Sequence, residues 1–264
     1  MKNKTSNQSG FTHKDFASVL NKYNYNLNLG DITAGTIFSK EKEGFLVDIG
    51  SKIAAYLPKD EMIIYQKNFD QQEMINETRE FFILAYNKKS EQLILSIKRL
   101  EYIRAWERIK QMEKEDIKLK LIVHEINKGG LLTLIEGIQG FIPNSHIVNI
   151  RNKNLLMNQN IECQFLLINE KSNKLILSNK RAILTKLSDT IYIGQITKGI
   201  VSKIESYGTF LIIYGINALL HISEIKKKEK QDTHTQLKIG DQVEVKIIHI
   251  DKKQGRLSVS QKNL

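Results

Sequence analysis

Apolar and polar residues alternate through much of the last third of the chain, a pattern typical of short β-strands with one buried face. Five segments show this alternation, at residues 194–201, 207–214, 218–222, 242–248 and 256–260. Five short strands with glycine-bearing turns are typical of a small closed barrel, and closure removes the exposed edges of an open sheet. We therefore expect one five-stranded barrel in this region.

The last of these strands contains a short sequence motif that occurs three times in the chain. Leu-Ile-Leu-Ser occurs at 93–96 and again at 175–178, and Leu-Ser-Val-Ser follows at 257–260. The final serines, Ser96, Ser178 and Ser260, are separated by 82 residues each. This interval is too long for a helical solenoid unit and close to the size of one small domain. The sequence therefore predicts a mainly β protein built from three tandem five-stranded barrels.

The segment after the first repeat has a helical pattern instead. Apolar residues recur at every third position among charged ones, at Ile103, Trp106, Ile109 and Met112, which favours an amphipathic linker helix. Trp106 is either a packing residue of this helix or a base-stacking platform, and packing is the commoner role. Residues 181–188 look like a shorter copy of the linker. Near the start of the chain, Thr12 and Asp15 predict the capped beginning of a short helix.

These patterns divide the 264 residues into five expected segments. They are an N-terminal segment with a short helix (1–26), repeat one (27–100), a linker helix (101–115), repeat two (116–188) and repeat three (189–264).

The net charge of +11 suggests an anionic partner, most often a nucleic acid. Its distribution is uneven, because residues 27–100 carry −1, residues 116–188 carry +5 and residues 189–264 carry +4. An RNA backbone should therefore prefer repeats two and three. No apolar run is long enough to span a membrane, so we expect no membrane partner. The lone Cys163 is expected to be a small buried hydrophobe.

Patterns associated with catalysis and cofactors are missing from the sequence. The six histidines, at positions 13, 124, 146, 221, 234 and 249, lack metal-ligand spacing, and one cysteine cannot form a zinc ribbon. The chain has no phosphate-binding loop and no nucleophile elbow. We expect a protein that is not an enzyme, with no cofactor, no bound metal and no small-molecule substrate.

Several motifs carry a resemblance to a known family. Residues 193–260 contain Gly-x-Ile-x-x-Gly-x-Val, Tyr-Gly-x-Phe, Leu-Leu-His-Ile-Ser-Glu and Ile-Asp-x-x-x-Gly-Arg-Leu-Ser-Val-Ser. They resemble the oligonucleotide-binding (OB) barrel named after the S-one family of small-subunit ribosomal proteins. Residues 11–17 and 30–38 resemble the short, three-domain form found in cyanobacteria and algal plastids. The resemblance implies three tandem OB barrels with short linker helices.

The resemblance also implies which residues of repeat three bind RNA. Tyr207 and Phe210 occupy the two aromatic positions of the family's binding face, and His221 matches a histidine on the neighbouring strand. Asp251 and Arg256 match an acid and a base at a turn. Aromatic faces stack on splayed bases, His stacks or donates a hydrogen bond, and Arg contacts phosphate or stacks.

Repeats one and two each keep one candidate RNA-binding residue. Phe45 stands at the position of Phe210, and Lys174 conservatively replaces Arg256. The other positions differ, with Lys42 at the place of Tyr207, Leu131 at that of Phe210, Pro58 and Pro143 at that of His221, Asn87 and Asn169 at that of Asp251, and Gln92 at that of Arg256. Tyr56 and Phe141, two residues before these prolines, are either core or exposed.

The resemblance implies a structural constituent of the small ribosomal subunit that binds single-stranded mRNA and aids translation initiation. Its partners would be mRNA, small-subunit proteins and rRNA. The alternative is a free RNA-binding regulator or an accessory subunit of an RNA-processing assembly. About 28 residues precede the first barrel, and Asn, Lys and Ile are abundant. We therefore expect a plastid protein bound to ribosomes in the stroma, with bacterial cytoplasm as the alternative.

Overall fold

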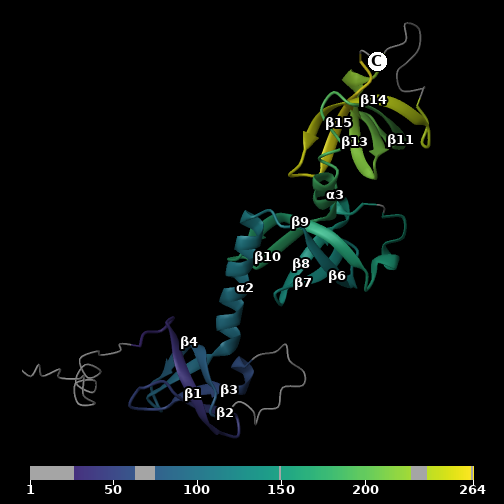
Figure 1. Ribbon diagram of the computed structural model, residues 1–264. Helices are drawn as coiled ribbons and strands as arrows, with labels where there is room; N and C mark the ends of the chain where they lie inside the picture. Colours follow the sequence, from purple (N-terminus) through teal and green to yellow (C-terminus); the bar gives the residue numbers. More distant parts are fainter. Residues whose placement is uncertain (1–26, 63–74, 149, 227–236, 263) are drawn as a thin grey trace, which may run out of the picture. The chain divides into compact units, whose positions relative to one another are not determined.

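The computed structural model describes residues 27–62, 75–148, 150–226, 237–262 and 264. Tertiary contacts group the chain into two compact units, residues 1–101 and residues 102–264. The helix expected around Thr12 and Asp15 lies outside the described residues. Within the described residues, three closed five-stranded barrels follow one another along the sequence, as the repeats predict (Figure 1).

Barrel 1 is formed by five strands and a short 3₁₀ helix, which are β1 (Ile32–Lys40), β2 (Gly44–Asp48), β3 (Ala55–Pro58), η1 (Lys59–Glu61), β4 (Thr78–Asn87) and β5 (Gln92–Ser96). The strand order around the barrel is β1-β2-β3-β5-β4. All neighbouring strands are antiparallel except β3 and β5, which are parallel. The core consists of inward-facing residues such as Ile37, Val47 and Leu95.

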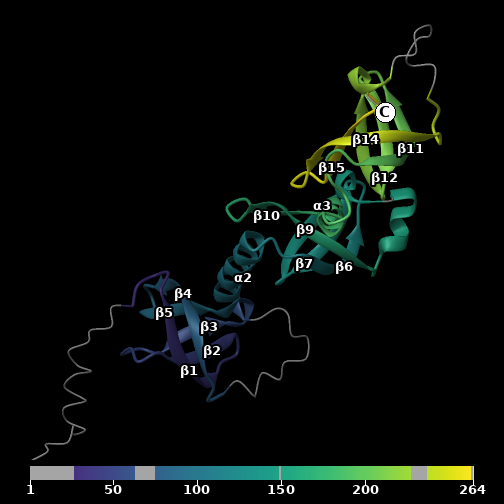
Figure 2. The ribbon, with the colours of Figure 1, turned by 45° about the horizontal axis from the view of Figure 1, so that its top comes forward.

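Barrels 2 and 3 repeat this topology (Figure 2). Barrel 2 consists of β6 (Leu119–Ile126), β7 (Gly130–Ile135), β8 (Ile138–Pro143), η2 (Asn144–His146), η3 (Ile150–Leu156), β9 (Asn160–Asn169) and β10 (Lys174–Ser178). Barrel 3 consists of β11 (Ile196–Glu205), β12 (Gly208–Ile213), β13 (Ile216–His221), η4 (Ile222–Glu224), β14 (Gln242–Asp251) and β15 (Arg256–Ser260). All five strands expected in repeat three are therefore present. The last has the expected bounds, and the other four have shifted ends.

A β-bulge interrupts the first strand of every barrel at the equivalent place. The pairing register shifts between Ile37 and Ser39 in β1, between Val123 and Glu125 in β6, and between Val201 and Lys203 in β11. A bulge bends its strand and increases the local twist. The first strand can therefore pair with both of its neighbours, and this double pairing closes each barrel.

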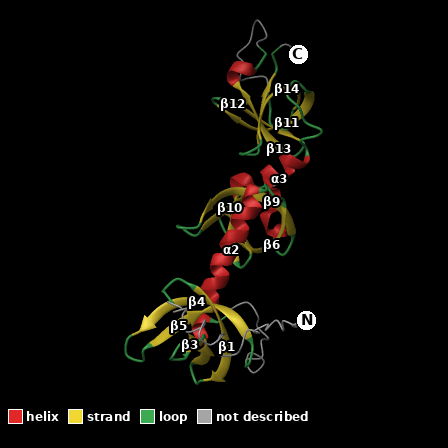
Figure 3. Cartoon of the chain, turned by 60° about the vertical axis from the view of Figure 1, so that its left-hand side comes forward, coloured by secondary structure: helices red, strands yellow, loops and turns green. Residues whose placement is uncertain are grey.

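Two helices follow the first two barrels, α2 (Ile97–Lys114) and α3 (Asn179–Lys186) (Figure 3). Helix α2 begins earlier than residue 101, because the Oγ of Ser96 accepts a hydrogen bond from the Arg99 amide at 2.8 Å and caps the first turn. Trp106 is fully buried in the core of barrel 2, with its ring centroid 6.3 Å from that of Tyr102. The packing role of Trp106 is therefore confirmed.

Candidate nucleic-acid interface

One row of outward-facing side chains crosses all five strands of barrel 3. Lys203 of β11 pairs with Phe210 of β12, which pairs with Leu219 of β13. Leu219 pairs with Ser258 of β15, and Ser258 pairs with His249 of β14. The residues next to them along the strands, such as Leu211 and Leu220, point into the core. We call Lys203, Phe210, Leu219, Ser258 and His249 the outer row of barrel 3.

The aromatic residues of this face lie at the start of β12. Tyr207 is 50% exposed, and its ring meets that of Phe210 edge to face, with centroids 6.1 Å apart and an interplanar angle of 89°. Lys203 forms an ion pair with Glu205, whose hydrogen bond and charge raise the pKa of the lysine. The ammonium group of Lys203 therefore lies on the same face as the two rings, with its charge partly offset by Glu205. Aromatic rings beside a lysine suit a base and its phosphate.

His221 ends β13 directly opposite Gly208, next to the two rings, and its side chain is exposed. Its Nδ1 accepts a hydrogen bond from the Ser223 amide at 3.2 Å. The neutral imidazole therefore carries its proton on Nε2, and this N–H can donate to a base or a sugar. The structure thus brings Tyr207, Phe210 and His221 together, as the spacing of the motifs predicts.

Asp251 and Arg256 face each other across the β14–β15 hairpin. The Oδ1 of Asp251 accepts a hydrogen bond from the Gln254 amide at 2.9 Å, so this carboxylate shapes the turn. Asn169 has the same role in barrel 2, where its Oδ1 accepts from the Ser172 amide at 3.1 Å. Lys174 is exposed and pairs with Asn169 as Arg256 pairs with Asp251. Lys174 therefore does occupy the place of Arg256.

The expectation for Phe45 is wrong. Gly44 pairs with Pro58 on the next strand, as Gly208 pairs with His221, so Phe45 corresponds to Thr209 and not to Phe210. Its ring is 0% exposed in the core of barrel 1 and cannot reach a base. The assignment was off by one residue, and a one-residue shift moves a strand side chain to the opposite face.

The same shift corrects two further correspondences. Leu131 is 0% exposed and also corresponds to Thr209, because Gly130 pairs with Pro143. The counterparts of Phe210 are Leu46 and Leu132, and both are partly exposed. Counting back from the same glycine, Glu43 and not Lys42 stands at the place of Tyr207.

Barrels 1 and 2 have outer rows with different chemistry. The strand pairings give Ser39, Leu46, Tyr56, Ile94 and Ala85 in barrel 1. They give Glu125, Leu132, Phe141, Ile176 and Leu167 in barrel 2. Tyr56 and Phe141 therefore belong to the outer face. The motifs do not predict that these rings and His249 lie on the outer face, because their position depends on pairing between strands.

Comparison with known proteins shows what the chain is similar to. The sequence profile of the S1 RNA binding domain matches residues 26–98 and 190–262. The small ribosomal subunit protein bS1c of Pyropia yezoensis is 51% identical over 262 residues, which cover 98% of this chain and 99% of the relative. The bS1A protein of Synechocystis is 44% identical, covering 97% of this chain and 78% of the relative. The bS1c protein of Spinacia oleracea is 38% identical, covering 96% and 62%.

The chain belongs to the bS1 family of small ribosomal subunit proteins.

Membership of the bS1 family confirms the resemblance carried by the motifs. The S1 domain profile covers most of barrels 1 and 3 but none of barrel 2. The topology nevertheless makes barrel 2 an equivalent barrel, with the same strand order and the same bulge. The similarity between these barrels therefore lies in their strand pairing more than in the side chains that the profile scores.

Basic residues gather where the end of barrel 2 meets barrel 3, within the unit 102–264. A Cβ added to Gly255 would lie 2.8 Å from the Cβ of Lys180, so the β14–β15 hairpin approaches the start of α3 closely. Burial, and then the charge of Arg256, lower the pKa of Lys180. This bS1 chain therefore holds Arg256 near Lys180, and two neighbouring positive charges favour an anion.

The described residues contain no group of three or more His, Cys, Asp and Glu arranged to hold a metal ion. Burial and the neighbouring Glu162 raise the pKa of the Cys163 thiol to about 12, so it stays protonated, as expected of a buried hydrophobe. No described helix is long and apolar enough to cross a membrane.

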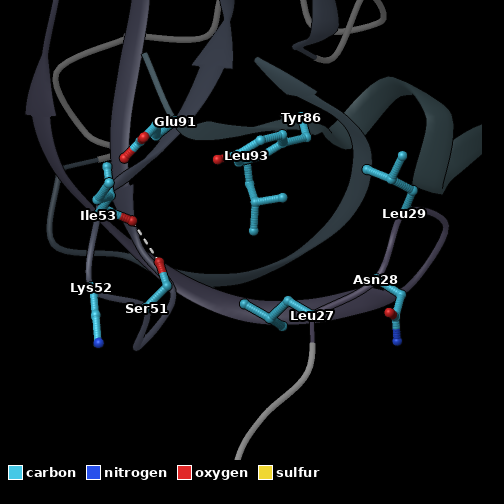
Figure 4. A pocket seen from close by; sticks show the side chains of 9 residues that line it. All are labelled: Leu27, Asn28, Leu29, Ser51, Lys52, Ile53, Tyr86, Glu91 and Leu93. Atoms are coloured by element: carbon cyan, nitrogen blue, oxygen red, sulfur yellow. Dashed lines mark hydrogen bonds between the residues drawn. The ribbon is translucent and has the colours of Figure 1, made fainter. Parts of the chain in front are cut away.

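Barrel 1 has a cavity of about 430 Å³ at one end (Figure 4). Residues of the segment entering β1, of the β2–β3 loop and of the β4–β5 hairpin line it, namely Leu27, Asn28, Leu29, Ser51, Lys52, Ile53, Tyr86, Glu91 and Leu93. None of these residues belongs to the outer row of barrel 1. Two of them, Tyr86 and Leu93, pair with each other directly next to Ala85 and Ile94, which do belong to that row.

Proposed function

We propose that this protein is a constituent of the small ribosomal subunit that captures single-stranded mRNA on barrel 3 and aids translation initiation. The observation that carries the proposal is the grouping of Tyr207, Phe210 and His221 on one exposed face, with Lys203 beside them. Rings stack on unpaired bases, the lysine attracts phosphate, and the Nε2–H of His221 donates a hydrogen bond. A duplex would not offer its bases to such a face.

Barrel 1, with the N-terminal segment, would attach the protein to the ribosome through protein contacts. Residues 27–100 carry a net charge of −1, which gives no general attraction to RNA. The relatives with the names bS1c and bS1A support the ribosomal role, and those of the bS1c type support a plastid location.

The test is co-sedimentation with small ribosomal subunits, with and without labelled single-stranded RNA. We expect the protein to sediment with the subunits and to retain the RNA there, whereas the Phe210→Ala variant should sediment with the subunits and retain less RNA. A protein that binds RNA but never sediments with subunits would instead be a free regulator or part of an RNA-processing assembly. A protein that sediments normally but ignores RNA would contradict the capture role.

A further inference from the structure

Barrel 2 also carries an aromatic ring on its outer face. Phe141 of β8 lies between Leu132 of β7 and Ile176 of β10, and it is partly exposed. A Cβ added to Gly130 would lie 2.8 Å from the Cε2 of Phe141, and one added to Gly129 would lie 3.4 Å from its Cζ. The ring therefore rests on the backbone of these two glycines, which leave it the room that side chains would fill.

Barrels 2 and 3 thus place aromatic surface beside the same glycine from different strands. In barrel 3 the rings of Tyr207 and Phe210 belong to the turn and strand that flank Gly208, and Leu219 is the residue of the neighbouring strand. In barrel 2 the neighbouring strand supplies Phe141, and β7 supplies the aliphatic Leu132. A base could stack beside Gly130 although barrel 2 lacks the aromatic pair of barrel 3.

Lysines surround the turn on which the Phe141 ring rests. Lys128 is exposed within the turn, and its carbonyl oxygen accepts a hydrogen bond from the Asn144 Nδ2 at 2.6 Å. The Nζ of Lys153 donates to the Asn127 carbonyl oxygen and lies 3.4 Å from the Asn144 Oδ1. The backbone of Lys128 and the ammonium group of Lys153 therefore both lie near the ring. Residues 116–188 carry a net charge of +5, which adds to their attraction for phosphate.

Two acidic residues of barrel 2 limit where phosphate can lie. Glu125 takes the place that Lys203 has in barrel 3, so the β6 end of the outer row repels a phosphate. Glu136, in the β7–β8 turn, is paired with Arg108 at 2.8 Å, which offsets its charge. The backbone of a bound strand would therefore follow the Lys128 and Lys153 side of the ring.

Barrel 1 presents an aromatic ring at the same position in a less basic setting. A Cβ added to Gly44 would lie 2.6 Å from the Cζ of Tyr56, so this ring also rests on the glycine of its hairpin. The adjoining turn carries Lys42 at the position of Lys128, and the Nζ of Lys59 donates to the carbonyl oxygen of Lys42. Glu41 and Glu43 offset the charges of these two lysines, whereas barrel 2 has the uncharged Asn127 and Gly129 at the same positions. Tyr56 is therefore a matched control for Phe141, since the two rings share their position and differ in surrounding charge.

We propose that barrel 2 holds a second site for single-stranded RNA, in which Phe141 stacks on a base and Lys128 and Lys153 contact the adjacent phosphates. The S1 domain profile does not match this barrel. The proposed site shares no residue with the outer row of barrel 3, so a substitution can remove RNA binding at one site without removing it at the other.

The test uses the full chain with Tyr207→Ala and Phe210→Ala, which weaken the barrel 3 site, and a fluorescent oligouridylate of about ten nucleotides. Adding Phe141→Leu, which preserves an apolar side chain like that of Leu219, should lower the remaining affinity by about fivefold to a hundredfold. Adding Tyr56→Leu instead should change the remaining affinity by less than about twofold, because we expect no base to stack on the Tyr56 ring. The fluorescence transition of the buried Trp106 shows whether barrel 2 stays folded.

Two further measurements keep the proposal falsifiable if Phe141→Leu disturbs the fold. Lys128→Gln alters an exposed side chain alone, whereas Lys153→Gln also removes the hydrogen bond to the Asn127 carbonyl oxygen. Each substitution should reduce the slope of log affinity against log salt by about 0.7. A 4-thiouridine probe should crosslink to residues 127–153 of the otherwise unaltered chain. Equal affinities of the Phe141→Leu and Tyr56→Leu chains, unchanged salt slopes and no crosslink would overturn the second site. Unchanged RNA affinity together with lost co-sedimentation would also overturn it and would assign the ring to a protein contact.

Discussion

The Oγ of Ser178 lies 3.0 Å from the Nδ1 of His146, and both side chains are buried. The same tie recurs in the other barrels, where Ser96 donates to the Oε2 of Glu61 at 2.6 Å and Ser260 donates to the Oε2 of Glu224 at 2.7 Å. Each of these side-chain hydrogen bonds joins the last strand of a barrel to the 3₁₀ turn that follows its third strand. The serines that reveal the repeat in the sequence are therefore structural residues and not RNA ligands.

Replacing Ser178 with Ala should lower the free energy of unfolding of barrel 2 by about 1–3 kcal/mol, because it removes a buried hydrogen bond and the cap of α3. The cap is the hydrogen bond from the Arg181 amide to the Ser178 Oγ, at 3.1 Å. Urea unfolding followed by Trp106 fluorescence measures this change, since the only tryptophan of the chain lies in the core of barrel 2. Ser172→Ala in the exposed β9–β10 turn is the matched control and should leave the transition in place.

Barrel 2 should lose stability as the pH falls below about 6.5. Burial, and then the charges of Lys180 and Arg256, lower the pKa of His146 in the folded protein. The unfolded chain therefore takes up a proton before the folded chain does, and unfolding is favoured between the ordinary pKa of histidine and the lowered one. Above this range the ring is neutral in both states and the loss is absent.

The measurement is Trp106-monitored unfolding at pH 7.5 and at lower pH, with the His146→Gln variant as control. This variant should show a smaller loss over the same range. Glu224 of barrel 3 should not contribute over this pH range. Side-chain hydrogen bonds to Ser260 and Lys262 lower its pKa, so its contribution to the stability of barrel 3 is lost only below the ordinary pKa of a glutamate. An equal loss in the His146→Gln protein would assign the effect to other groups.

Phe210→Ala should weaken binding of single-stranded RNA by about fivefold to a hundredfold, the loss of one stacking platform. The ring is partly exposed on the outer face, so barrel 3 should stay folded, which calorimetry can verify. Leu132→Ala replaces the residue at the equivalent position of barrel 2 and should change RNA affinity much less. Equal losses in two folded variants would show that the binding face is not confined to the rings.

Phe45→Ala should destabilise barrel 1 by about 3–5 kcal/mol, because it leaves a cavity in the core. RNA affinity of the folded variant should be unchanged, since the ring is 0% exposed. Calorimetry gives the stability, and Leu46→Ala on the opposite face of the same strand should cost less. A folded Phe45→Ala protein with reduced RNA affinity would restore Phe45 to the binding face.

Affinity for single-stranded RNA should depend strongly on salt. If barrels 2 and 3 together neutralise about four to six phosphates, log affinity should fall with log salt at a slope of about −3 to −4. Fluorescence anisotropy between low and physiological salt measures this slope. A flat dependence would indicate a protein scaffold, because counterion release accompanies every phosphate contact.

The sequence by itself determined the number of barrels, their order and the class of fold. The alternation of apolar and polar residues and the repeated serines can both be read from short stretches of sequence. The alternation marks the strands because every strand must bury one face. The spacing of Tyr207, Phe210 and His221 was also sufficient to bring them together, since they lie on two strands joined by a short turn. Helix α2, in contrast, begins four residues before the expected start, because a serine of the preceding strand caps it.

Only the tertiary structure decided which face each remaining residue occupies. Phe45 and Phe210 are both aromatic residues close to a hairpin glycine, yet one is core and the other is on the outer face. The pairings of Gly44 with Pro58 and of Gly208 with His221 fix this difference, and a shift of one residue reverses it. His249 joins the outer row of barrel 3 because Ser258 of β15 pairs both with it and with Leu219 of the distant β13. Phe141 lies on the outer face of barrel 2 because it pairs with Leu132 across the β7–β8 hairpin. Pairing between strands, and not a motif, assigns both residues to these faces.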